Sequence, residues 1–136
     1  ASGSGMAAIA AAKAGAARVA AVEIDDFAVA AIGLNAAANG VTLDVLRDDI
    51  VGRPLPEIDV ILAGDVCYER PMAERVIAWL RDLARGGTLV ILGDPGRAYL
   101  PKSGLEALAR FAVPTSLDLE DREVRDTTVW RLLGEG

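Results

Sequence analysis

The chain has 136 residues, 52% of them hydrophobic, so we expect one domain over residues 1–136 with its own buried core. Its 20 acidic and 14 basic residues leave a net charge of −6, which argues against a nucleic-acid partner bound through phosphates. With one cysteine and no histidine, the chain has no disulfide framework and no His-based catalysis, and we expect no metal site. No apolar run approaches the roughly 20 residues that cross a membrane, so we expect no membrane partner.

The first predicted elements are a glycine-rich loop, a helix and a strand. The loop, residues 1–5, leads into an alanine-rich helix over 6–16, and an apolar run over 18–24 predicts a buried parallel strand. Gly3, Ser4 and Gly5 are candidate cofactor contacts, because glycine lets the backbone pass close under a ligand and the helix that follows presents free N–H groups. Glu23, with Ile24 beside it, follows about 20 residues later and is expected to accept hydrogen bonds from a ribose.

A glycine loop of this kind is expected to follow a strand, which fixes where the loop points. No residue precedes Ala1, and the chain does not begin with methionine. We therefore expect a chain truncated at its N-terminus that lacks the first strand of its sheet.

The remaining chain alternates between predicted helices and strands. We expect helices over residues 27–38, from 71 to about 84 and over 103–111, and strands over 41–46, 57–64 and 88–92. Two alternating runs at the end, 114–119 and 127–133, predict an antiparallel hairpin around a charged turn at 120–126. The fold class is therefore α/β, a doubly wound and mostly parallel sheet with an antiparallel C-terminal strand.

The glycine loop does not by itself identify the ligand. Residues 3–8 fit the G-x-G-x-x-A form of the dinucleotide fingerprint, but a similar loop also binds S-adenosylmethionine. Dinucleotide folds continue with parallel units, whereas class I methyltransferases end with a reversed strand in the sheet. The antiparallel ending therefore favours a methyltransferase that uses S-adenosylmethionine.

Four predicted strands end in an acidic residue, namely Glu23, Asp49, Asp65 and Asp94. In an open α/β sheet, ligands bind at the carboxyl ends of the strands. Asp49 and Ile50 are placed to meet an adenine through a carboxylate and a backbone N–H, although Asp48 fits equally by spacing. Cys67 is expected to be a packing residue, because no nearby His or Lys lowers its pKa.

Three stretches carry a more specific resemblance. These are Asp65-Val66-Cys67-Tyr68 (D-x-x-Y), Gly93-Asp94-Pro95-Gly96-Arg97 and Thr127-Thr128-Val129-Trp130. Together they resemble the electron-transfer flavoprotein β-subunit lysine methyltransferases, from Ala1 to the last strand. The resemblance implies an S-adenosylmethionine-dependent protein-lysine methyltransferase whose protein substrate is that subunit. It further implies that Asp65 and Tyr68 are the catalytic pair at the lysine entry, with Asp65 also near the cofactor, and that Glu23 contacts the ribose.

Two other readings of the sequence stay open. The same cofactor motifs suit a class I methyltransferase acting on another protein or on a small molecule. A chain lacking its central strand could also be catalytically inactive. The Ala- and Arg-rich composition is typical of a bacterial cytoplasmic protein, whereas eukaryotic relatives would be mitochondrial, and we expect a monomer.

Overall fold

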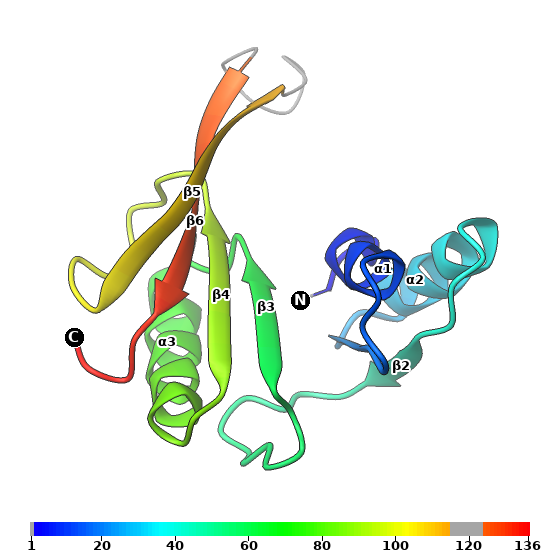
Figure 1. Ribbon diagram of the computed structural model, residues 1–136, viewed down its shortest axis with the longest axis horizontal. Helices are drawn as coiled ribbons and strands as arrows, with labels where there is room; N and C mark the ends of the chain where they lie inside the picture. The colour runs from blue at the N-terminus through cyan, green and yellow to red at the C-terminus, as the bar shows by residue number, and fades with distance from the viewer. Residues whose placement is uncertain (1, 115–123) are drawn as a thin grey trace. The chain divides into compact units, whose positions relative to one another are not determined.

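The computed structural model describes residues 2–114 and 124–136, which form two compact units, Ala1–Ile50 and Val51–Gly136. The first contains helix α1 (Met6–Lys13), strand β1 (Ala20–Glu23), helix α2 (Asp26–Ala38) and strand β2 (Asp44–Arg47). The second contains strand β3 (Val60–Gly64), helix α3 (Arg70–Arg85) and strands β4 (Leu89–Asp94), β5 (Leu105–Pro114) and β6 (Val124–Leu132) (Figure 1).

In the first unit, two short parallel strands and two alanine-rich helices share a small core. β1 and β2 pair in parallel along their whole lengths. The Asp25 carboxylate caps α2 by accepting hydrogen bonds from two N–H groups of its first turn. Ala8 of α1, Ala21 of β1 and Ile32 of α2 form the buried cluster. The small alanine side chains let both helices lie close to β1.

The second unit is built on a four-stranded sheet in the order β3-β4-β6-β5. β3 and β4 are parallel, and β6 lies antiparallel between β4 and β5. The amphipathic helix α3 covers one face of this sheet (Figure 1). Large apolar side chains buried in this contact come from α3, β4 and β6: Val76, Ile77, Leu80, Val90, Leu92 and Leu132.

The predicted helix over residues 103–111 is wrong, because Leu105–Pro114 forms strand β5. Its segment LEALAR consists of strong helix formers, so the local propensity favours a helix. The pairing of β5 with β6 over nearly its whole length, with one register shift between Ala107 and Ala109, outweighs that propensity. β5 is therefore an edge strand whose residues are mostly exposed.

The predicted reversed strand near the C-terminus is confirmed by β6, which runs antiparallel to both of its neighbours. Its partner is β5 rather than the predicted run over 114–119. Of that run only Pro114 lies within the described residues, and residues 120–123 of the predicted turn also lie outside them. In the part of the chain that the structure describes, no helix is long and apolar enough to cross a membrane.

Candidate functional site

The glycine loop bends sharply before α1. Gly5 is the N-cap residue of α1 with φ 85°, a left-handed conformation that favours glycine. A Cβ at Gly5 would lie 3.2 Å from the Ile32 side chain, so the loop packs closely on α2. The loop is fixed further by Asn35 of α2, whose side-chain amide donates to the Ser4 carbonyl at 2.9 Å. Asn35 was not among the predicted site residues, because nothing local in α2 distinguishes it.

Ser2 ties the start of the loop to β1. Its backbone N–H and its hydroxyl both donate to the Val22 carbonyl, at 3.2 and 2.8 Å, and the Val22 N–H donates to the Ser2 hydroxyl at 2.9 Å. The N–H and C=O groups of Val22 face away from β2, because the neighbouring residues bond to β2. Ser2 therefore lies along the edge of β1 that β2 leaves open.

Glu23 joins the end of β1 to the glycine loop. Its carboxylate is 7% exposed and accepts hydrogen bonds from the N–H of Gly3 at 3.0 Å and of Ile24 at 2.9 Å. Burial raises the pKa of Glu23, but the two backbone donors and the positively charged N-terminal amino group together outweigh it and lower the pKa. Glu23 is thus a charged hydrogen-bond acceptor at the end of β1. The structure brings the predicted Gly3 and Glu23 together.

Asp49 and Ile50 follow β2 at the same end of the two-stranded sheet as Glu23, namely the carboxyl ends of its parallel strands. The N–H of Asp48 donates to the Glu23 carbonyl at 3.2 Å, which fixes this end of β2 beside the end of β1. Asp48 and Asp49 are both exposed, and Ile50 is half-buried. This geometry does not choose between the two carboxylates.

In the second unit, Asp65 follows β3 with φ 49°, the one positive φ at a described non-glycine residue. Its N–H donates to the Gly93 carbonyl at 2.9 Å, so the ends of β3 and β4 are joined there. Arg97 donates two hydrogen bonds to the Asp65 carboxylate, one from Nε and one from Nη2, each at 2.7 Å. This pairing lowers the pKa of Asp65 against the opposing effect of burial, with a further contribution from the charge of Arg125.

The turn after β4 presents Arg97. Asp94 is 1% exposed, and its Oδ1 accepts hydrogen bonds from the N–H groups of Gly96 and Arg97, both at 2.7 Å. Gly96 has φ 90°, so the tight turn depends on a glycine there. The sequence placed Asp94 among the acidic strand ends, but gave Arg97 no role, because an arginine in a loop is usually a solvated surface residue.

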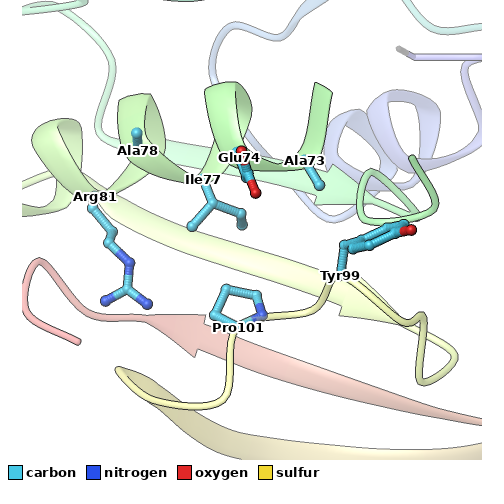
Figure 2. A pocket seen from close by; sticks show the side chains of 7 residues that line it. All are labelled: Ala73, Glu74, Ile77, Ala78, Arg81, Tyr99 and Pro101. Atoms are coloured by element: carbon cyan, nitrogen blue, oxygen red, sulfur yellow. The ribbon is translucent and has the colours of Figure 1, made fainter. Parts of the chain in front are cut away.

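A shallow cavity of about 360 Å³ lies over this pair in the second unit. It is lined by Gly64, Asp65, Gly93, Pro95, Arg97, Val113, Arg125 and Thr127. The ends of β3 and β4, the turn after β4 and the paired strands β5 and β6 therefore all contribute to it. A second cavity of similar volume, about 360 Å³, lies along α3 between Ile77, Arg81 and Tyr99 and contains none of the predicted site residues (Figure 2).

Cys67 and Tyr68 have different surroundings. Cys67 is fully buried, and burial, with the nearby charges of Asp94 and Asp65, raises its pKa to about 11. A thiol with so high a pKa is a packing residue, as predicted from the sequence. Tyr68 is 55% exposed and is not among the described residues that line the cavity over Asp65. Within residues 2–114 and 124–136, no three acidic, Cys or His side chains form a metal-binding group.

The fold is that of the class I methyltransferases. One solved structure of this class, magnesium protoporphyrin IX methyltransferase from Synechocystis PCC 6803 with bound SAM, superposes with a TM-score of 0.66 at 20% identity. The match covers 97% of this chain and 66% of that one.

Residues 1–93 match the family Ribosomal protein L11 methyltransferase (PrmA), and the chain belongs to this family. The electron transfer flavoprotein beta subunit lysine methyltransferase of Xenopus laevis is 37% identical over 94% of this chain and 54% of its own length. The protein of the same name from Danio rerio is 35% identical over 95% of this chain and 52% of its own length. The chain thus spans about half the length of the curated relatives it matches.

Proposed function

We propose that this protein is an S-adenosylmethionine-dependent protein-lysine N-methyltransferase and that its substrate is the electron-transfer flavoprotein β subunit. The observation that carries the cofactor assignment is the bond between the Gly3 N–H and the charged Glu23 carboxylate at the end of β1. A Cβ on Gly3 would meet no heavy atom within 4 Å, so there is open space above the loop beside this carboxylate. The residues present therefore fit the cofactor.

In this proposal the first unit binds the cofactor. Gly3, Ser4 and Gly5 cradle its methionyl part, Glu23 with Ile24 binds the ribose hydroxyls, and Asp49 with Ile50 binds the adenine. When bound, S-adenosylmethionine supplies a methyl group attached to a good leaving group. A neutral lysine amine takes this methyl group by direct displacement. The net charge of −6 supports a basic protein surface as the partner rather than a nucleic acid.

The second unit orients the lysine. Asp65, with Tyr68 as a wall of the channel, holds the ammonium and then the amine in line for attack. Alignment of two reactants can lower the barrier by about 7–11 kcal/mol. General acid–base catalysis typically accelerates a reaction about 10²–10⁴-fold, which corresponds to only about 3–5 kcal/mol. The absence of histidine from the chain is therefore compatible with this chemistry. We further propose a monomer, in the cytoplasm of a bacterium.

The similarity to the flavoprotein-subunit methyltransferases favours that substrate over ribosomal protein L11. It extends over 135 residues, including D-x-x-Y and the last strands, whereas the L11 methyltransferase family matches only residues 1–93. Residues beyond 93 contribute Pro95, Arg97 and Thr127 to the cavity over Asp65. Much of the lining of the proposed lysine site, although not Asp65 itself, thus lies in the part of the chain that the flavoprotein-subunit methyltransferases match and the L11 methyltransferase family does not.

Calorimetric titration with S-adenosylhomocysteine and with NADH tests the cofactor, and transfer of labelled methyl groups to the two candidate proteins tests the substrate. We expect S-adenosylhomocysteine to bind and NADH not to bind. Glu23→Gln should weaken the binding of S-adenosylhomocysteine at least tenfold. The flavoprotein subunit should be methylated. Asp65→Ala should abolish transfer with nearly unchanged cofactor affinity. Arg131→Ala, which breaks an exposed ion pair with Glu106, is the matched control. Binding of NADH alone would refute the proposal. Methylation of ribosomal protein L11 alone would show that L11, and not the flavoprotein subunit, is the substrate.

A further inference from the structure

The carboxylate of Asp65 is already bound within the protein. Arg97 engages both of its oxygens in a two-pronged arrangement, the geometry for which a planar guanidinium is suited. The Arg97 side chain is 26% exposed and that of Asp65 is 47% exposed, so the pair lies at the mouth of the cavity rather than in the core. The pair lines the cavity and does not belong to the hydrophobic core, so we infer a role in positioning a group within the cavity.

Arg97 is itself held by a buried group. Asp94, at the end of β4, binds the N–H groups of Gly96 and Arg97 and so fixes the turn from which the guanidinium extends. The N–H of Leu100 donates to the Arg97 carbonyl at 3.2 Å, which fixes the other side of the same residue. A chain of contacts therefore runs from buried Asp94 through Arg97 to Asp65.

We propose that Arg97 is a positioning residue that holds the Asp65 carboxylate in one orientation at the proposed lysine site. The proposal rests on the function proposed above, because it concerns the same lysine site. Charged groups that act on Asp65 are Arg97 itself and, on β6, Arg125. With both arginines opposing its protonation, Asp65 orients the lysine nitrogen without taking its proton, and that proton leaves to solvent before the nitrogen attacks.

Arg97→Ala and Arg97→Lys separate charge from geometry. Lysine keeps the positive charge but cannot make the two-pronged contact. We expect kcat to fall by about 10²-fold in Arg97→Ala, as for a misplaced catalytic group, with the cofactor affinity unchanged. Arg97→Lys should lose most of that activity even though it keeps the charge. A kcat of Arg97→Ala equal to that of the wild type would overturn the proposal.

A double-mutant cycle tests whether Arg97 acts through Asp65. We expect Asp65→Asn, which keeps a hydrogen-bond acceptor, to retain a low rate that single-turnover assays measure. In that background Arg97→Ala should lower the rate no further, because the group it positions has already been changed. An equal loss of kcat in both backgrounds would show an independent role and refute the proposal. Arg131→Ala again serves as the control for the loss of an arginine.

Titration of the Asp65 carboxyl by carbon NMR in the full-length protein gives a readout that does not need activity. The pKa of Asp65 should be below its usual value in the wild type and should rise toward it in Arg97→Ala. An unchanged pKa would refute the positioning role even if transfer is observed. Absence of transfer by the wild type, with the expected change in pKa, would instead refute only the proposed function.

Discussion

At the scale of single residues, two carboxylates are kept charged by different donors. Glu23 is bound by the backbone N–H groups of Gly3 in the glycine loop and of Ile24, the residue after β1, whereas Asp65 is bound by the side chain of Arg97. Substituting one side chain does not remove a backbone donor, whereas a substitution of Arg97 removes a side-chain donor. The donors to Glu23 therefore survive a side-chain substitution, whereas Arg97→Ala removes both hydrogen bonds that Arg97 donates to Asp65.

The reactivity of Cys67 is a direct test of its surroundings. With its pKa raised to about 11, little thiolate is present at pH 8, and the side chain is fully buried. We expect iodoacetamide to alkylate the folded chain at pH 8 far more slowly than the chain unfolded in urea, as followed by mass spectrometry. Equal rates would show that the loop after β3 opens readily and that Cys67 is not packed as described.

At the scale of elements, the core of the second unit depends on α3. Leu80 is 1% exposed and packs with Val90, Leu92 and Leu132. Leu80→Ala should lower the free energy of unfolding by about 2–5 kcal/mol, because it removes buried methyl groups and leaves a cavity. Urea denaturation measures this change. Leu108→Ala, at a position 49% exposed on β5, should cost much less and is the control. Similar losses at both positions would contradict this packing.

The element that sequence reasoning missed, β5, shows where local patterns fail. Helices α1, α2 and α3 and strands β1 to β4 follow from alanine content, capping residues and apolar periodicity, all of which act within a few residues. β5 has helix-forming residues but pairs with β6, from Leu105 with Leu132 to Pro114 with Val124. That pairing is a tertiary contact, which a local pattern does not encode.

At the scale of the whole molecule, β1 and β3 are two of the four edge strands in the two described sheets, together with β2 and β5. Among the described strands, β1 pairs with β2 and β3 pairs with β4. Both are parallel strands with apolar residues, which are typically buried between neighbours. That a further strand pairs with these edges stays a prediction, and hydrogen exchange can test it at β3.

The N–H groups along β3 point alternately to its two sides. Those of Ile61, Ala63 and Asp65 face β4. The N–H groups of Leu62 and Gly64 face the open edge of β3. We expect the amides of Leu62 and Gly64 to exchange with solvent faster than those of Ile61 and Ala63 in this polypeptide. In a longer protein that supplies a strand to this edge, the difference should disappear. Equal protection in the present polypeptide would show that the edge of β3 is already covered. NMR-detected exchange measures each amide separately.

The sequence alone determined the α/β class, the glycine loop and the acidic strand ends. Spacing along the chain carries these features: Gly3 and Glu23 lie 20 residues apart and do form a hydrogen bond. Only the tertiary structure decided that residues 105–114 form a strand and that Arg97, 32 residues beyond Asp65, binds its carboxylate. The physical reason is that such contacts depend on the register of paired strands and on the turn capped by Asp94, and neither leaves a periodic signal in the sequence.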